Sequence, residues 1–224
     1  MTVVNYARYV ANRSRVDASR AEHQVYADAM RTHDRLLMGG PLLGDDGRPN
    51  GVLLIYQVAS KQQAERLVQS DPFVQQGAIE SYRLDDWTIT DKNMASLAAA
   101  LVPEDQRAAH EKPALRRSAQ AQADTLPMRS YVHYASFVSD HSKAGVARPA
   151  HQAYARRIQA DGRLIIAGPF ADDSGGLFIY RARSKEEAMK LVTEDPYYIE
   201  GIFETVALSE WRMFGLNAEL IQPG

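Results

Sequence analysis

Two histidines and two aspartates recur at equivalent positions of this sequence and together could move a proton. The chain holds 6 histidines, but only His23 and His151 occupy matching places in two similar stretches. Asp71 and Asp195 match each other in the same way. A carboxylate that accepts the Nδ1 proton of an imidazole orients the ring and leaves Nε2 free to act as a base. The sequence therefore indicates a catalytic proton-transfer pair that needs no metal, present twice.

An arginine and a tyrosine accompany each pair. Arg20 and Arg148 precede the two histidines by three residues, so on a helix they lie about one turn away. A guanidinium at that distance could hold an anionic or phenolic substrate. Tyr6 and Tyr134 stand in stretches of alternating residues, in which every second side chain of a strand points to the same face. We expect these two tyrosines to line the substrate pocket.

Both aspartates also have a structural interpretation. Asp71 precedes Pro72 and Asp195 precedes Pro196, and such pairs make good helix-ending turns in which the aspartate bonds its own backbone. A repeat keeps residues for the fold as readily as for function. From the residues alone the structural role is slightly favoured over the catalytic one, and both stay open.

The matching positions reflect a duplication of most of the chain. The stretch AEHQVYADAMRTHDRLLMGGPL resembles PAHQAYARRIQADGRLIIAGPF, and GVLLIYQVASKQQAERLVQSDPF resembles GGLFIYRARSKEEAMKLVTEDPY. The second copy lacks four residues of the first between these two stretches, and the similarity continues to Trp87 and Trp211. An internal repeat of this kind indicates that one structural unit occurs twice.

Each copy has the strand pattern of a β-α-β-β-α-β unit. Alternating residues rich in Val, Tyr and Phe predict first strands at 3–10 and 130–138. Further strands are expected at 35–38, 52–58, 163–166 and 177–182, with a last strand in each copy that runs into Trp87 or Trp211. The Gly-Pro pairs at 40–41 and 168–169 are expected to end the second strand of their copy as turns.

Two helices are expected in each copy. The spacing of Ser19-Arg20-Ala21-Glu22 is that of a capping box, which predicts a helix start there and places His23 in the first turn. Pro149 suits the first turn of the matching helix. In that position the helix dipole favours the neutral form of a histidine. The second helices are expected to begin at the N-caps Ser60 and Ser184 and to end before the Asp-Pro pairs.

These elements divide the chain into two small domains of the ferredoxin-like class. Their expected bounds are 1–90 and 128–214, with a partly helical linker at 91–127 and a C-terminal tail at 215–224. A sheet with both helices on one face leaves its other face apolar and in need of a partner. We therefore expect an α+β fold in which two tandem ferredoxin-like (βαββαβ) domains pair as an intramolecular dimeric α/β-barrel. A further homodimer of this pseudo-dimer stays open.

Composition argues against several classes of function. The 26 basic and 28 acidic residues give a formal charge of −2, whereas nucleic-acid-binding domains carry a basic excess. No apolar run reaches the length of a membrane span, and arginines interrupt the N-terminal stretch where a signal peptide is apolar. The absence of cysteine fits a cytoplasmic protein. Without metal-ligand spacing or a Gly-rich phosphate loop, we expect a small-molecule substrate and no cofactor, metal, nucleic acid or membrane.

The sequence resembles the YCII-related (YciI-like) family. The second copy carries the pattern as Arg148-x-x-His151, Gly162–Pro169, Ser184…Ala188 and Asp195-Pro196-Tyr197…Gly201, and the first as Arg20-x-x-His23, Arg35–Pro41, Ser60…Ala64 and Asp71-Pro72-Phe73…Gly77. The resemblance implies a dimeric α/β-barrel and a His–Asp active site at His23 with Asp71 and at His151 with Asp195. Some relatives act on small aromatic rings, including the dehydrohalogenation of chlorinated hydroxylated benzenes. The first copy departs from the pattern at Asp34, where glycine is usual.

Two functions of different kinds fit these observations. The leading hypothesis is a cofactor-free lyase, isomerase or dehydrohalogenase in which the histidine moves a proton on a small aromatic or enolisable molecule. The aspartate would orient the ring, and the arginine would steer an anion. The alternative is a non-catalytic module that binds a small molecule or assists a pathway. A histidine out of hydrogen-bond reach of its aspartate and walled off from any cavity would count against the enzyme.

Overall fold

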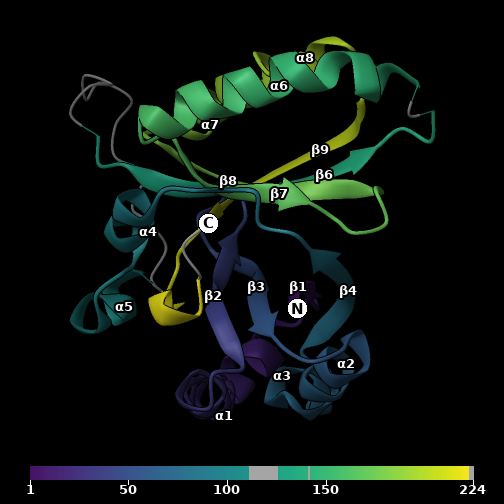
Figure 1. Ribbon diagram of the computed structural model, residues 1–224. Helices are drawn as coiled ribbons and strands as arrows, with labels where there is room; N and C mark the ends of the chain where they lie inside the picture. Colours follow the sequence, from purple (N-terminus) through teal and green to yellow (C-terminus); the bar gives the residue numbers. More distant parts are fainter. Residues whose placement is uncertain (111–125, 141, 222–224) are drawn as a thin grey trace. The chain divides into compact units, whose positions relative to one another are not determined.

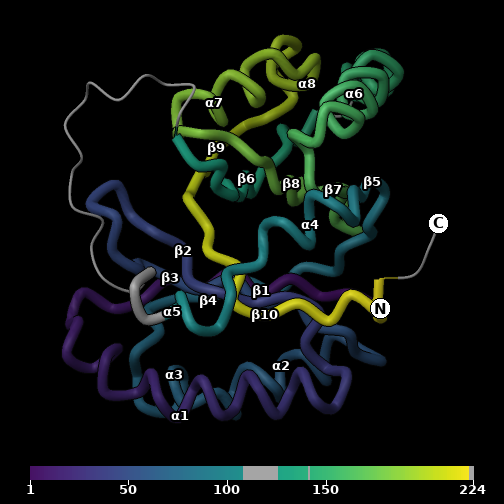
Figure 2. The backbone as a smooth tube through the Cα atoms, turned by 90° about the vertical axis from the view of Figure 1, so that its left-hand side faces the viewer, coloured from purple at the N-terminus to yellow at the C-terminus, as the bar shows by residue number. Residues whose placement is uncertain are grey.

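Both copies of the repeat fold as β-α-β-β-α-β units with their helices on one face of an antiparallel sheet (Figures 1 and 2). The computed structural model describes residues 1–110, 126–140 and 142–221. By its contacts the chain divides into two units. Unit 1 comprises Met1–Asp86, Leu101–Pro113 and Arg212–Gly224, and unit 2 comprises Trp87–Ala100 and Ala114–Trp211. The expected ferredoxin-like class is confirmed for each copy.

Unit 1 contains the first copy of the repeat. Its strands run in the order β4-β1-β3-β2, and β3 pairs antiparallel with both β1 and β2. The elements of this copy are β1 (Thr2–Tyr9), α1 (Arg13–Thr32), β2 (Leu36–Leu43), β3 (Pro49–Gln57), α2 (Lys61–Ser70), α3 (Pro72–Gln75) and β4 (Ile79–Trp87). Later parts of the chain add α5 (Glu104–His110), β10 (Gly215–Leu216) and the 3-10 turn η2 (Ala218–Leu220).

Unit 2 contains the second copy. Its strands run in the order β9-β6-β8-β7-β5, and β6, β7 and β8 pair antiparallel with their neighbours. The elements of this copy are β6 (Arg129–Phe137), α6 (Ser142–Ala160), β7 (Leu164–Pro169), β8 (Gly175–Ala182), α7 (Lys185–Thr193), α8 (Pro196–Ile199) and β9 (Phe203–Trp211). The segment after β4 adds β5 (Asp91–Lys92) and α4 (Met94–Ala100). Helices α4 and α5 both lie in the stretch expected to be a partly helical linker.

The helix-facing side of each sheet forms the core of its unit. In β1 the alternate residues Val3, Ala7 and Tyr9 belong to this core, as the two-residue period of a strand requires. In β6 the equivalent residues Tyr131 and Ala135 do the same. The alternation therefore separates the side chains that can meet the helices from those on the opposite face.

The first helix of each copy begins earlier than the sequence predicted. Helix α1 starts at Arg13 after the N-cap Asn12, and α6 starts at Ser142 with Pro149 in its interior. The capping-box prediction is wrong because Ser19 lies within the helix, where its hydroxyl donates to the Arg15 carbonyl one turn back (2.9 Å). The second helices do begin after Ser60 and Ser184, as predicted.

The Gly-Pro pairs are not the turns that the sequence predicted. Gly40 and Pro41 continue β2, and Gly168 and Pro169 continue β7. Each pair is contacted by a segment that follows a last strand, and we call residues 88–93 and 212–217 the exchanged segments. Residues 88–93 follow the first copy yet belong to unit 2, and residues 212–217 follow the second copy yet belong to unit 1.

The exchanged segments bind their strands in the same register. The Arg212 N–H donates to the Pro41 carbonyl (3.1 Å) and the Phe214 N–H to the Gly39 carbonyl (2.9 Å). In unit 2, at the equivalent positions, the N–H groups of Thr88 and Thr90 donate to the carbonyls of Pro169 (3.0 Å) and Ala167 (2.9 Å). The exchanged segment therefore docks on its strand in the same way in both units, so the residues of the two segments can be compared position by position.

Glycine is required at this junction because the backbones approach closely. A Cβ on Gly40 would lie 1.9 Å from the Arg212 oxygen, and one on Gly168 would lie 1.8 Å from the Thr88 oxygen. Real Cβ atoms do not come so near to a backbone oxygen. The Gly-Pro motif thus serves the docking of an exchanged segment, which local sequence patterns do not reveal.

The Gly168→Ala substitution should destabilise the protein by about 2 kcal/mol, because the exchanged segment must move away from the new methyl group. Urea unfolding measures the change. Gly145→Ala is the matched control, since this glycine lies in α6 with nothing within 4 Å of its added Cβ. The control should gain about 0.5–1 kcal/mol from helix propensity. Equal effects of the two substitutions would contradict the close-approach explanation.

The core of unit 2 also buries an ionisable group. His133 on β6 is 0 % exposed, and its ring lies 5.0 Å from Phe203 and 5.6 Å from Phe178 between centroids. Burial lowers the pKa of His133 from 6.5 to about 3. The equivalent position of the first copy is Asn5. Since the unfolded chain takes up the proton below pH 6.5 and the folded chain does not, acid favours unfolding.

The stability that depends on neutral His133 should be fully present above pH 6.5 and lost as the pH falls toward about 3. The expected slope is about 1.4 kcal/mol per pH unit. Urea unfolding between pH 7 and pH 4 should show a flatter dependence for His133→Asn, which copies the first repeat, than for the unchanged protein. His33→Asn, at an exposed position, should leave the slope unaltered. Parallel curves for all three proteins would refute the assignment.

Candidate active site

The structure brings each predicted histidine to its predicted aspartate. The Nδ1 of His23 lies 2.8 Å from Oδ1 and 3.0 Å from Oδ2 of Asp71. In the second copy the Nδ1 of His151 lies 2.7 Å and 3.0 Å from the two carboxylate oxygens of Asp195. Because an ionised carboxylate only accepts, Nδ1 carries the hydrogen and Nε2 of the neutral ring is left as an acceptor.

Each histidine stands in the middle of a helix, about three turns from its N-terminus. The predicted first-turn position is therefore wrong, and His23 and His151 lie outside the first turn, where the effect of a helix dipole is concentrated. The aspartate, and not the helix terminus, determines which ring nitrogen holds the hydrogen. The side chain of His23 is 11 % exposed, and that of His151 is 14 % exposed.

Each aspartate makes the hydrogen bond of a helix-ending turn as well as the bond to its histidine. The Asp71 Oδ1 accepts from the Phe73 backbone N–H (2.9 Å) as well as from His23, and so caps α3 where α2 ends. Asp195 makes the same bond to the Tyr197 N–H (2.8 Å). The turn chemistry of the Asp-Pro pair thus fixes the carboxylate that in turn orients the imidazole.

An aromatic ring supports each imidazole on its face. His23 stacks on Phe73 and His151 on Tyr197, both with centroids 4.0 Å apart. Stacking and the carboxylate together fix the plane and direction of the ring. Among the residues that the structure describes, neither Nε2 has a hydrogen-bond partner. That nitrogen is the one available to a bound molecule.

Tyrosines near the carboxylates stay protonated. Burial, and then the negative charge of Asp71, raise the pKa of Tyr26 to about 12. Burial and Asp71 also hold the pKa of Tyr56 well above its usual value. The hydroxyl of Tyr26 donates to the Leu67 carbonyl (2.7 Å). At neutral pH these phenols are donors and not bases, so the histidine is the candidate proton acceptor.

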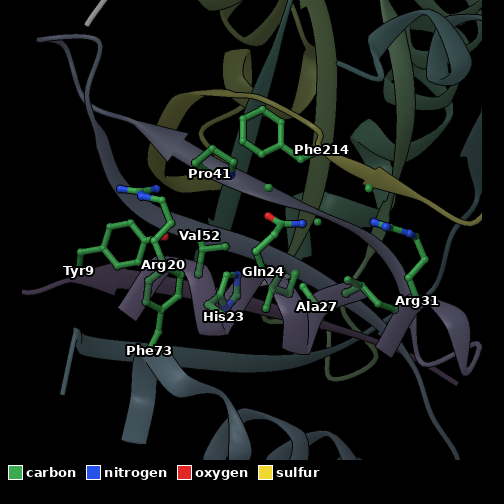
Figure 3. A pocket seen from close by; sticks show the side chains of 15 residues that line it. Tyr9, Arg20, His23, Gln24, Ala27, Arg31, Pro41, Val52, Phe73 and Phe214 are labelled. Carbon is green, nitrogen blue, oxygen red and sulfur yellow. The ribbon is translucent and has the colours of Figure 1, made fainter. Parts of the chain in front are cut away.

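In unit 1 the dyad opens onto a narrow cavity of ≈ 40 Å³. Figure 3 shows the His23 ring beside Phe73 and the amide of Gln24 reaching toward the side of Pro41 and Phe214. Its lining comes from α1, β1, β2, β3, α3 and the exchanged segment: Tyr9, Arg20, His23, Gln24, Ala27, Arg31, Leu36, Gly39, Gly40, Pro41, Val52, Leu54, Phe73, Phe214 and Gly215. This volume holds a few water molecules.

In unit 2 the equivalent cavity measures ≈ 590 Å³. It is lined by Thr90, Asp91, Phe137, Arg148, His151, Gln152, Ala155, Arg156, Gln159, Ala167, Gly168, Pro169, Asp173, Phe178 and Tyr197. Small-molecule sites have volumes of about 300–1,000 Å³. This cavity is therefore large enough for an organic molecule.

The other predicted site residues divide into two groups. Arg20 and Arg148 line their cavities as predicted. Tyr6 and Tyr134 do not, because their neighbours in β1 and β6 face the helices and alternation turns these tyrosines to the opposite side of the sheet. Neither tyrosine is therefore a wall residue of the two histidine cavities.

The strand aromatics that line the cavities are instead Tyr9 and Phe137, which the same alternation places on the helix side. Two further groups of cavity residues were not predicted from the sequence. Gln24 and Gln152 directly follow the histidines in both copies, and this retained His-Gln pair was a usable signal. The exchanged segments carry no local motif, so only the folded structure reveals that they line the cavities.

Neither a metal cluster nor a membrane helix is found in the described part of the chain. Residues 1–110, 126–140 and 142–221 contain no group of three or more His, Cys, Asp or Glu side chains placed to hold a metal ion. Within the same ranges, each helix is too short or too polar to cross a bilayer.

Known proteins resemble the chain at two levels. The model of the YCII-related domain family matches residues 1–88 and 130–212. YjpA, an uncharacterized protein of Bacillus subtilis (strain 168), is 36 % identical over 63 residues, which are 28 % of this chain and 73 % of YjpA. Chlorite dismutase from Candidatus Nitrospira defluvii is 11 % identical with a TM-score of 0.52 and covers 94 % of this chain and 90 % of its own.

A dehydrochlorinase also matches one part of the chain. It is the 5-chloro-2-hydroxyhydroquinone dehydrochlorinase of Burkholderia phenoliruptrix AC1100 in complex with 2,5-dihydroxybenzoquinone, with 25 % identity over 40 % of this chain and 96 % of its own and a TM-score of 0.36. The likeness to chlorite dismutase spans nearly the whole chain and shows a common fold. The expected dimeric α/β-barrel class is thereby confirmed, and it is a fold that enzymes use.

Removing the carboxylate should cost more stability than neutralising it. Asp195→Ala leaves the Nδ1 hydrogen and the Tyr197 N–H without an acceptor, which should cost about 2–3 kcal/mol. Asp195→Asn keeps a carbonyl oxygen for these donors and should cost about 1 kcal/mol or less. Urea unfolding at pH 7 measures both. A loss for Asn as large as that for Ala would contradict the shared-acceptor geometry.

Proposed function

The chain belongs to the YCII-related domain family, and we propose that it is a cofactor-free enzyme of the lyase or isomerase type. In this proposal the His–Asp pairs move a proton on a small aromatic or enolisable molecule. The observation that carries the proposal is the Nδ1–carboxylate bond of 2.7–2.8 Å with Nε2 left free at a cavity, present in both copies. A base held in one orientation and open to a ligand is what general base catalysis requires.

The chemical step follows from the ring orientation. Nε2 removes a proton from a carbon or hydroxyl of the substrate, and the imidazolium that forms is stabilised by the buried carboxylate of Asp195 or Asp71. The electron pair released in the substrate either expels a leaving group as an anion, as in a lyase or dehydrohalogenase, after which the imidazolium gives its proton to water, or shifts within the molecule. In the second case the imidazolium returns its proton at another position, as in an isomerase.

The cavity walls supply binding and orientation. Arg148 on α6 lines the same cavity as His151 and would hold the negative charge of the substrate. Phe137, Phe178 and Tyr197 present aromatic surface, which favours a flat molecule. These features support a small organic anion or phenol, and the dehydrohalogenation of chlorinated hydroxylated rings is one reaction of this class.

The proposal is tested by a thermal-shift screen against aromatic acids, quinols with and without chlorine, and lactones, followed by turnover assays on the compounds that stabilise the protein. The double variant His23→Ala/His151→Ala should lose about 100- to 10,000-fold in turnover, the usual contribution of a general base. His33→Ala, an exposed histidine at the end of α1, is the matched control and should keep full activity.

Circular dichroism of the double variant establishes that a lost activity is not lost folding. Unchanged turnover in the folded double variant would sink the mechanism. Compounds that bind but are not converted by the unchanged protein would instead favour the non-catalytic binding module.

A further inference from the structure

We propose that the two repeat-equivalent cavities have diverged, so that the cavity of unit 2 takes a small flat organic anion while that of unit 1 is closed to it. Phe214 and a polar network centred on Asp28 close the first cavity. The inference rests on the proposed function for the nature of the site, and it assigns that function to one of the two copies. Three comparisons between equivalent residues carry it.

The docking of the exchanged segments and the geometry of the dyad do not differ between the cavities. The two exchanged segments bind β2 and β7 through equivalent hydrogen bonds of 2.8–3.1 Å, and the His–Asp distances agree within 0.1 Å. The volumes nevertheless differ, with ≈ 40 Å³ in unit 1 and ≈ 590 Å³ in unit 2. Two differences remain: the β7–β8 hairpin, which lacks four residues of the β2–β3 hairpin and brings Asp173 to the larger cavity, and the side chains on the shared part of the backbone.

The exchanged segments supply one of these side chains. Phe214 lines the cavity of unit 1 and is 8 % exposed, whereas its equivalent in unit 2 is the smaller Thr90. Figure 3 shows the Phe214 ring on the side of the cavity toward which Gln24 points. The next residue is Gly215, and a Cβ there would lie 2.8 Å from the guanidinium of Arg31. Arg31 thus packs directly against this segment.

Asp28 on α1 holds two side chains in the first cavity. It accepts from the Gln24 amide (3.1 Å) and from the Arg31 guanidinium (2.6 Å), and both of these donors line the cavity. The bonds hold Gln24 and Arg31 at the cavity wall, with Arg31 against Gly215 of the exchanged segment. Unit 1 in this way satisfies its own polar groups without a ligand.

The second copy lacks this network. Arg156 stands where the first copy has Asp28, and Gln159 stands where it has Arg31. Gln159 is turned toward the exchanged segment, where it donates to the Lys92 carbonyl (2.8 Å). Gln152, the equivalent of Gln24, therefore has no carboxylate beside it on the helix and stays available in the larger cavity.

The pairing of the cavity arginines also differs between the two copies, and it favours an anionic ligand in unit 2. Arg20 is neutralised by Asp17 (2.9 Å) one turn before it, but the residue in that place beside Arg148 is Gly145. In the described part of unit 2, neither Arg148 nor Arg156 makes an ion pair. Two unpaired guanidiniums thus flank Gln152 along one face of α6, next to His151.

Two carboxylates from other elements also line this cavity. Asp91, on the exchanged segment, accepts from the Thr90 hydroxyl (2.8 Å), and Asp173 lies in the loop between β7 and β8. These oxygens suit hydroxyl groups of a ligand whose anionic end faces Arg148 and Arg156. An unpaired guanidinium beside the base is the feature that selects a negative charge.

Chemical modification of the two histidines tests the divergence without a known substrate. Diethyl pyrocarbonate acylates accessible neutral imidazole, and peptide mass spectrometry gives the rate at each histidine. In the unchanged protein, His151 should react about tenfold faster than His23 or more, the ratio that corresponds to a difference of about 1.4 kcal/mol in the barrier. Equal rates, or a faster reaction at His23, would overturn the proposal.

Reciprocal variants assign the difference to the exchanged segments. Phe214→Thr should raise the rate at His23, and Thr90→Phe should lower the rate at His151, each about tenfold toward the value of the other copy. Val25→Thr, at an exposed position of α1 outside the cavity, should change neither rate. Circular dichroism checks that each variant is folded. If Phe214→Thr does not fold, the rate at His151 in Thr90→Phe tests the role of this position. A folded Thr90→Phe protein with an unchanged rate at His151 would refute the role of this position.

The anion is tested by protection with two probes of the same shape. Benzoate should slow the modification of His151 more than the neutral benzamide does, and Arg148→Gln/Arg156→Gln should abolish the difference. Benzoate is added up to about 10 mM, so that binding with a dissociation constant in the millimolar range is detected. Equal protection by the two probes, or no protection by benzoate, would overturn the charge assignment.

These results are independent of turnover. If the double histidine variant loses activity while both histidines react at one rate, the proposed function stands and the divergence fails. If the modification rates differ and the double variant keeps its activity, the divergence stands and the proposed mechanism fails.

Discussion

A buried carboxylate in each copy joins three helices, and the site depends on this single group. Asp71 ends α2, caps α3 and accepts the Nδ1 hydrogen of a histidine in the middle of α1. Because the same oxygen serves the Phe73 N–H and the ring, the geometry of the imidazole is set by an ordinary turn. The fold and the proposed chemistry therefore share one interaction, and the Asp-Pro turn occurs together with the His–Asp pair in both copies.

The exchanged segments form the second constraint. They bind beside Gly40 and Gly168, where a larger residue would collide with backbone oxygen, and they contribute residues to the walls of the cavities. The backbone hydrogen bonds set their register equally in both units. A side-chain difference such as Thr90 against Phe214 therefore changes the cavity without changing how the segment docks. Duplication followed by such changes allows one copy to keep an open site while the other becomes closed.

Much of this could be predicted from the sequence because the relevant patterns are local or repeated. The helix starts at Ser60 and Ser184 follow from N-cap chemistry within a few residues. The partners His23 and Asp71 were predicted correctly, but the prediction placed His23 in the first turn of its helix, whereas the pair forms at the middle of α1. The start of α1 was missed because a serine inside a helix can bond the preceding turn, and the capping-box spacing does not distinguish the two cases.

The sequence by itself determined the repeat, the order of elements, the family and the dyad, for which residue types and spacing suffice. Only the tertiary structure decided the faces on which Tyr6 and Tyr9 lie, the function of the Gly-Pro pairs, and the sizes of the cavities. Each of these depends on residues far apart in the chain that meet at a few ångströms. Such contacts leave no local pattern, since the approach of a distant backbone and the volume left between side chains exist only in the folded chain.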